Sequence, residues 1–172
     1  MKVGPSHWVG SELFLKISGD ASEGRFSIVE HPIDPGRMVH PHVHAHEDEF
    51  SYILEGEIGA RIGDEMLQAA TGSYVFKPRG LPHTFWNATT KPARLLELIS
   101  PAGFEKYFAE LADLLRTGGG VDQITNLAER YGMELRMDWV PGTLREVQAE
   151  ACGRIGLGFA RYPVVLGFTV TV

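Results

Sequence analysis

Short runs of apolar and β-branched residues, each bounded by glycine or proline, dominate the first hundred positions of the chain. Such runs, separated by turn residues, predict an all-β sandwich or barrel. The expected strands cover Glu12–Ile17, Arg25–Pro32, Arg37–His44, Phe50–Glu55, Glu57–Ile62, Tyr74–Pro78, His83–Asn87 and Ala93–Ile99. Gly56 directly separates two of these runs, so it marks a tight turn or a bulge.

The hydrophobic pattern changes to a helical period at residue 100. Ser100 and Pro101 are typical of a helix N-cap and first helical position. Apolar residues then recur with helical spacing at Phe104, Phe108, Leu111 and Leu115. Asp122 can cap a second helix, which Gly132 would end. We therefore expect residues 1–100 to form a barrel and residues 101–140 an all-helical appendage packed on it.

The last segment, residues 141–172, has no clear pattern. Leu144–Cys152 is compatible with a short helix. Ile155–Val172 contains no acidic residue and is rich in Val, Phe and Gly, so it is compatible with a strand. That strand could pair with the barrel edge or with a second subunit, or the segment could have no evolved role.

Composition and charge narrow the class of protein. The 172 residues carry a formal net charge of −6, which disfavours binding to nucleic acid or to an anionic membrane. The single cysteine, Cys152, excludes an intrachain disulfide and a zinc site built from cysteines. No apolar run is long enough for a membrane span. We expect a soluble, cytoplasmic protein.

A dense cluster of histidines and acidic residues lies between positions 40 and 49. Side chains two apart on a strand point the same way, so His42 and His44 can reach one metal ion. A turn through residues 45–48 would bring the Glu49 carboxylate back to them. His83 comes from a separate run behind a proline-rich turn. Three imidazoles and one carboxylate suit a divalent first-row metal and leave positions open for water or substrate.

The spacing of these residues resembles the two sequence motifs of the cupin superfamily. The first motif is matched by Gly36, His42, His44, Glu49 and Gly56, and the second by Gly72, Pro78, Gly80, His83 and Asn87. The resemblance covers about residues 25–100, with motifs at 36–56 and 72–87. The helix start at Pro101–Glu105 is similar to that of the quercetin-dioxygenase-like branch.

The resemblance implies a double-stranded β-helix, or jelly-roll barrel, with a metal inside it. The ligands would be His42, His44, Glu49 and His83; the motif spacing favours Glu49 over the neighbouring Glu47 and Asp48. The family uses iron, manganese, nickel, copper or zinc, and the motif does not select among them. Residues that share strand parity with the ligands, or lie on a strand leading to them, would form a substrate pocket: Met38, His40, Ile53, Phe76 and Phe85.

The resemblance implies a metal-dependent oxidoreductase of the dioxygenase type, acting on a small enolic or phenolic compound. Glu49 would be both a ligand and the catalytic proton acceptor. Three alternatives remain open, namely a cupin isomerase or decarboxylase, a metal-binding small-molecule sensor without catalysis, and a structural barrel. A homodimer is expected, because the edges of a single jelly roll need protection.

Overall fold

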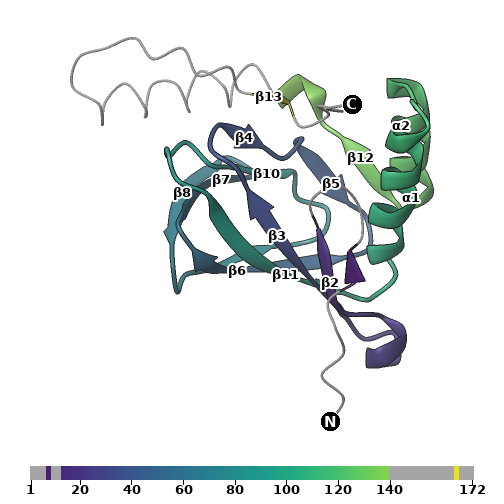
Figure 1. The fold of residues 1–172 in the computed structure, drawn as a ribbon, viewed down its shortest axis with the longest axis horizontal. Helices are drawn as coiled ribbons and strands as arrows, with labels where there is room; N and C mark the ends of the chain where they lie inside the picture. Colours follow the sequence, from purple (N-terminus) through teal and green to yellow (C-terminus); the bar gives the residue numbers. More distant parts are fainter. Residues whose placement is uncertain (1–6, 9–12, 140–164, 167–172) are drawn as a thin grey trace.

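The computed structural model describes residues 7–8, 13–139 and 165–166. The expected helix at Leu144–Cys152 and most of the expected strand at Ile155–Val172 lie outside these residues. None of the described helices is long and apolar enough to cross a lipid bilayer. Within the described ranges the chain forms a barrel of strands with two helices beside it (Figure 1).

The elements follow one another in two blocks, strands first and helices second. The strands are β1 (His7–Trp8), β2 (Phe14–Ile17), β3 (Ser27–Ile33), β4 (Arg37–Met38), β5 (His42–His44), β6 (Asp48–Glu55), β7 (Glu57–Ile62), β8 (Glu65–Ala70), β9 (Tyr74–Lys77), β10 (His83–Trp86), β11 (Ala93–Ser100), β12 (Met133–Leu135) and β13 (Val165–Leu166). The α-helices are α1 (Glu105–Arg116) and α2 (Val121–Arg130), and short 3-10 turns cover Asp20–Ser22 and Met137–Trp139.

The strands form two sheets that face each other. One sheet has the order β1-β2-β3-β11-β6-β9. The other runs β12-β5-β10-β4-β13, and β10 also pairs with β7, which pairs with β8. Among the described strands, all pairings are antiparallel except that of β13 with β4. The mainly β jelly-roll fold predicted from the sequence is confirmed.

The core between the sheets follows from strand alternation. On β11, inward residues alternate with residues that are partly or fully exposed, and Leu95 is completely buried. Leu95 packs with Ile33 of β3 and Ile53 of β6 in one apolar cluster. Burying three such aliphatic side chains stabilises the barrel by several kcal/mol, at ~1.5–3 kcal/mol each.

The expected strands differ from the structure most clearly in one divided run and one additional strand. The run Arg37–His44 is divided into β4 and β5, because the chain between them, which contains Pro41, is irregular. Strand β8 was not expected, since Glu65–Ala70 lacks the β-branched residues that mark the other strands. It forms because it pairs with β7 over six residue positions.

Helix α1 begins later than the sequence predicts. Pairing of β11 with β6 continues to Ser100, opposite Asp48, so Ser100 is a strand end and not a helix cap. The helix starts at Glu105, whose carboxylate accepts hydrogen bonds from the backbone N–H groups of Gly19 (2.9 Å) and Gly103 (2.6 Å). Helix α2, by contrast, begins earlier than predicted, because its N-cap is Gly120 and the predicted cap Asp122 already lies in the first turn.

The appendage after residue 100 is not all-helical, which corrects the sequence prediction. After α2 the chain turns at Gly132, whose φ of +67° is in the left-handed region. It then forms β12, which pairs with β5 so that Met133 lies opposite His44. The three residues of β12 are too few to show strand alternation, which is why the sequence did not predict this strand. Both helices pack with β12 on Val29 and Ile99 of the first sheet.

Gly56 forms the tight turn between β6 and β7. Its φ is +78°, and a Cβ atom there would lie 2.9 Å from the Ala93 Cα and 2.9 Å from the Pro92 carbonyl oxygen. Gly72 has a similar φ of +90°, but a Cβ atom there would meet nothing within 4 Å. The two glycines share the backbone constraint and differ only in the space around them.

We predict that Gly56→Ala is more destabilising than Gly72→Ala. Each substitution places a Cβ in the left-handed region, at a cost of ~1–2 kcal/mol. Gly56→Ala adds a collision with the β11 backbone, worth a further ~1–3 kcal/mol. Urea denaturation of both variants measures the difference, and equal midpoints would show that the close approach at Gly56 does not constrain the fold.

Candidate metal centre

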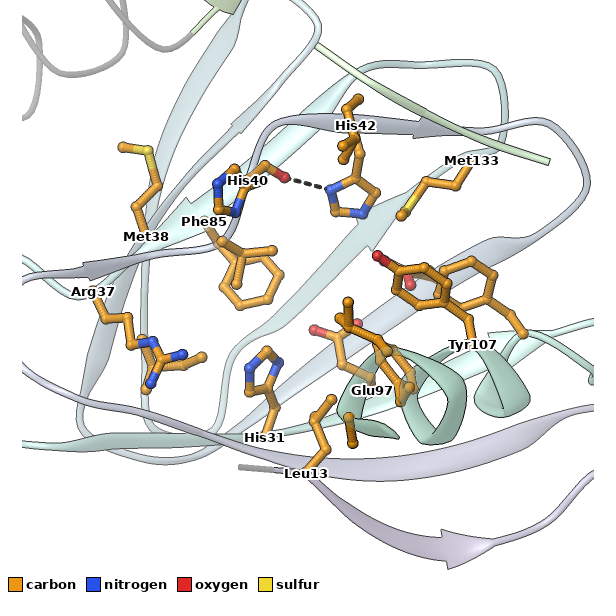
Figure 2. A pocket seen from close by; sticks show the side chains of 18 of the residues that line it. Leu13, His31, Arg37, Met38, His40, His42, Phe85, Glu97, Tyr107 and Met133 are labelled. Carbon is orange, nitrogen blue, oxygen red and sulfur yellow. Dashed lines mark hydrogen bonds between the residues drawn. The ribbon is translucent and has the colours of Figure 1, made fainter. Parts of the chain in front are cut away.

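A cavity of about 160 Å³ lies inside the barrel and reaches the inner face of α1 (Figure 2). Most of its wall is apolar, with Met38, Phe85 and Met133 among the lining residues. The aromatic residues Phe104, Tyr107 and Phe108 also line it. The sequence predicts Phe104 and Phe108 in a helix packed on the barrel. In the structure all three aromatic residues pack in the cluster between the helices and the barrel and also line the cavity.

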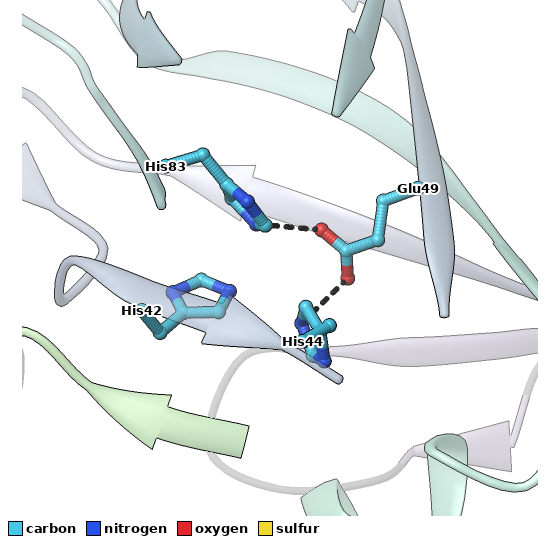
Figure 3. A group of neighbouring side chains, drawn as sticks. All are labelled: His42, His44, Glu49 and His83. Carbon is cyan, nitrogen blue, oxygen red and sulfur yellow. Dashed lines mark ion pairs between the residues drawn. The ribbon is translucent and has the colours of Figure 1, made fainter. Parts of the chain in front are cut away.

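The four predicted ligands come together in one cluster (Figure 3), and two of them, His42 and Glu49, line this cavity. His42 and His44 come from β5, Glu49 from β6 and His83 from β10, and all four are buried. One ligand atom from each residue lies within 4.8 Å of the others. The Glu49 carboxylate bridges two rings, with Oε1 3.3 Å from His44 Nε2 and Oε2 3.2 Å from His83 Nε2.

Strand geometry explains this convergence. His42 and His44 flank Val43 on β5 and are both buried, while Val43 is less so. His83 of β10 lies directly opposite His42 across the antiparallel pair. The chain then turns at residues 45–47 and returns as β6, which brings Glu49 to the same site from the opposing sheet.

Two imidazoles are oriented by backbone carbonyls. His42 Nδ1 is 2.6 Å from the His40 carbonyl oxygen, and His83 Nδ1 is 3.2 Å from that of Leu81. A carbonyl only accepts hydrogen bonds, so Nδ1 of each ring must donate, and Nε2 is left with a lone pair for a metal. On His44 the corresponding atom, Nδ1, lies 3.5 Å from Glu47 Oε2, an ion-pair distance at which neither atom makes a hydrogen bond. Glu47 itself is buried, so its carboxylate does not face solvent.

The donor atoms fit a metal ion. Nε2 of His44 and Nε2 of His83 are buried and have no hydrogen-bond partner. Leaving such groups unsatisfied costs ~1–3 kcal/mol each, which coordination would recover. Three imidazole nitrogens with one carboxylate oxygen suit zinc and the divalent metals from manganese to copper.

The charges of the site favour a cation among these side chains. Burial opposes ionisation of Glu49, but the Lys77 ammonium and His44 hold its pKa well below the usual value. Burial also opposes protonation of His44, yet Glu49 and Glu47 raise the pKa of that imidazole to about 9. Burial lowers the pKa of both His42 and His83, so these rings are neutral. Either a proton on His44 or a bound metal ion would supply the positive charge that balances the Glu49 carboxylate.

A buried lysine supports the ligand carboxylate from behind. Lys77 of β9 is 1% exposed, and its Nζ lies 2.9 Å from Glu49 Oε2 and 2.6 Å from Glu97 Oε2. Ser51 Oγ donates a hydrogen bond of 2.8 Å to Glu97 Oε1. Burial lowers the pKa of a lysine, but Glu49 and Glu97 outweigh it and raise the pKa of Lys77. Lys77 is therefore an ammonium ion.

The predicted pocket residues divide into three groups. Met38, His40 and Phe85 line the cavity. Ile53 instead lies in the apolar core between the sheets. The prediction for Phe76 is wrong, because Lys77 points inward on β9 and its neighbour must point outward. Phe76 is 50% exposed and stacks on Phe50, with 4.6 Å between the ring centroids.

Sequence reasoning missed four polar residues of the site: His31, Arg37, Lys77 and Glu97. His31 lines the cavity and meets Phe85 edge-on at 5.7 Å. Burial, with Lys77 nearby, lowers the pKa of His31 to about 4, so the ring is neutral at pH 7. Each of the four is a polar residue in a strand, and such a residue normally indicates the solvent face. Strand alternation is the signal that could identify Lys77, because Lys77 lies two positions after Val75 and therefore on the same, buried face of β9.

Comparisons with known proteins agree with this architecture. Residues 30–99 match the family model described as Cupin domain. The chain is 31% identical over 102 residues to the tetracenomycin polyketide synthase protein TcmJ of Streptomyces glaucescens, covering 58% of this chain and 67% of that protein.

Two solved structures are also similar. TT1209 from Thermus thermophilus is 28% identical with a TM-score of 0.48, over 58% of this chain and 90% of the other. KdgF from Halomonas is 18% identical with a TM-score of 0.49, over 60% and 93%. The match to the family model covers both ligand motifs and the strands that carry them, and, with the Streptomyces relative, it shows that the chain belongs to the cupin superfamily.

Proposed function

We propose that this cupin is a metal-dependent enzyme that oxidises a small enolic or phenolic compound with dioxygen, as the resemblance to the quercetin-dioxygenase-like branch implies. One observation carries the proposal: ring nitrogens of three imidazoles and the carboxylate of Glu49 converge in a cluster, two members of which, His42 and Glu49, line a largely apolar cavity. A cavity of this kind, apolar with a few convergent polar groups, is the usual form of a small-molecule site.

His42, His44, Glu49 and His83 would hold one divalent transition metal from the set iron, manganese, nickel, copper and zinc. The bound metal would supply Lewis acidity and, where it is redox-active, exchange electrons with dioxygen. In a dioxygenase reaction both oxygen atoms enter the product and the substrate supplies the electrons. No external reductant is then needed, in keeping with a site of this small size.

Glu49 would also accept the proton of the substrate hydroxyl. Its two oxygens face different rings, so one can keep a ligand position while the other takes the proton. Lys77 makes this carboxylate a weak base, so the transfer needs an acidic hydroxyl. Enolic and phenolic hydroxyls meet that need better than alcohols do. The relative TcmJ, named as a polyketide synthase protein, supports a substrate of this kind.

We predict that the purified protein binds about one equivalent of a transition metal and that His83→Ala loses it. Removing one of four ligands leaves three donors, which is an incomplete site that should not retain the metal through dialysis. Metal content is measured by inductively coupled plasma mass spectrometry after dialysis. His46→Ala is the matched control, since His46 is exposed and lies outside the cluster. Equal metal content in all three proteins would contradict the ligand assignment.

We predict that the iron-, manganese-, nickel- or copper-loaded protein consumes dioxygen with a flavonol or a 1,3-diketone, and that Glu49→Gln lowers the rate at least ~100-fold. An oxygen electrode measures uptake, and labelled dioxygen identifies the atoms in the product. Product formation without dioxygen would assign an isomerase or decarboxylase instead. Saturable binding without any product would assign a sensor or binding module.

We predict that Lys77→Met destabilises the metal-free protein by ~3–5 kcal/mol, because it leaves Glu49 and Glu97 buried without their cation. The double variant Lys77→Met/Glu97→Gln removes one of the two stranded charges and recovers part of that loss. Urea unfolding of both variants gives the two free energies. A loss below ~1 kcal/mol for Lys77→Met would show that the buried ion pairs are not coupled to folding.

A further inference from the structure

The three imidazoles of the ligand cluster are supported in two different ways. His42 Nδ1 lies 2.6 Å from the carbonyl oxygen of His40, and His83 Nδ1 lies 3.2 Å from that of Leu81. These carbonyls belong to the main chain and oblige each ring to donate through Nδ1. Within the described part of the chain, Nδ1 of His44 is buried and has no hydrogen-bond partner. The orientation of His44 therefore needs a different explanation.

Glu47 is the side chain that faces Nδ1 of His44. It lies in the turn between β5 and β6, three residues after His44, and its Oε2 is 3.5 Å from that nitrogen. Glu47 is only 7% exposed, whereas a glutamate in a turn is normally solvated. Burying a carboxylate is costly unless it gains a polar partner. The inward position of Glu47 thus points to a role beside His44.

Three buried polar atoms at this contact lack a hydrogen-bond partner among the described residues: both ring nitrogens of His44 and Oε2 of Glu47. Leaving buried polar atoms unsatisfied is costly, and here one explanation accounts for all three. A cation held at Nε2 would use the lone pair of that nitrogen. The proton of the neutral ring would then reside on Nδ1, where Oε2 of Glu47 can accept it.

The next carboxylate along the chain, Asp48, faces the other way. Its Oδ1 accepts hydrogen bonds from the backbone N–H and from Nε of Arg79, at 2.9 and 3.1 Å, and its Oδ2 accepts one of 2.7 Å from Nη2. The Asp48 and Arg79 side chains are both partly exposed. Two neighbouring carboxylates therefore differ in direction, since Asp48 pairs at the surface and Glu47 points to the ligand cluster.

We propose that Glu47 is a positioning residue for the metal: its carboxylate accepts the Nδ1 proton of His44 and so fixes the ring with Nε2 available as a ligand. This inference rests on the proposed function and deepens it by adding a residue that controls metal affinity at the same site. An anionic acceptor also makes the imidazole a stronger donor to the metal. Of the three ligand rings, His44 is then the one whose support is a replaceable side chain.

Zinc affinity tests this role without turnover, because zinc does not exchange electrons. Competition with a chromogenic chelator at one fixed pH gives the dissociation constant. Loss of a carboxylate that supports a ligand histidine weakens metal binding about 10- to 100-fold, and we expect that loss in Glu47→Gln. Glutamine has nearly the size of glutamate, so the turn should keep its conformation. Circular dichroism spectra of the variant should match that of the unmodified protein.

Two matched variants separate positioning from the effect of charge alone. Asp48→Asn removes the same charge one residue away, from a surface pair, and should leave zinc affinity within about twofold. Glu47→Asp keeps the charge and withdraws the carboxylate from His44 by one methylene, so it should lose affinity as Glu47→Gln does. Full affinity in Glu47→Asp, or an equal loss in Asp48→Asn, would overturn the positioning role.

Nuclear magnetic resonance gives a readout that a merely structural role would not move. In the zinc-loaded protein with ¹⁵N-labelled histidine, the Nδ1 proton of His44 should resonate downfield, because it is shared with a carboxylate. In Glu47→Gln this resonance should move upfield or be lost to exchange with water, while those of His42 and His83 stay in place. An unchanged His44 resonance would contradict the proposal.

The outcomes separate the role of Glu47 from the proposed function. Zinc affinity that depends on Glu47, in a protein that consumes no dioxygen with any metal, would support the positioning role and overturn the oxidation. Equal zinc affinity of Glu47→Gln and the unmodified protein would overturn the positioning role and leave the oxidation standing. Failure of the unmodified protein to bind zinc or any other of these metals would overturn both.

Discussion

The candidate metal centre depends on the burial of one ammonium ion. Lys77 lies between Glu49 and Glu97 in the barrel interior. Its positive charge offsets the repulsion between the two buried carboxylates. Burial of an isolated carboxylate would force it to take up a proton. Because Lys77 holds Glu49 ionised and at a fixed distance, the imidazoles of the opposing sheet meet a formed anionic ligand.

The fold class and the pairing of His42 with His44 could be predicted from short-range geometry, because side chains two apart on a strand share a face. The addition of Glu49 and His83 to the ligand set came from the resemblance to the cupin motifs. The turns before Glu49 and His83 contain the acidic, glycine and proline residues that favour turns. The expected homodimer and cytoplasmic location stay predictions.

The remaining features depend on pairing partners that are distant in the sequence. Phe76 and Lys77 show this most clearly, since a phenylalanine is exposed and a lysine is buried on the same strand. The inversion is stable only because Glu49 and Glu97 arrive from β6 and β11. Strand β12 likewise exists because β5 offers it an edge. No local pattern carries that information.

Two of the three imidazoles are held by main-chain carbonyls, those of His40 and Leu81. A carbonyl of the main chain persists whatever side chain its residue carries. Replacing His40 would therefore change the cavity wall and still leave the acceptor that orients His42. The architecture separates the groups that orient the candidate ligands from the side chains that shape the cavity. A barrel built in this way is evolvable, since mutation can reshape the cavity while the main-chain groups that orient the candidate ligands stay intact.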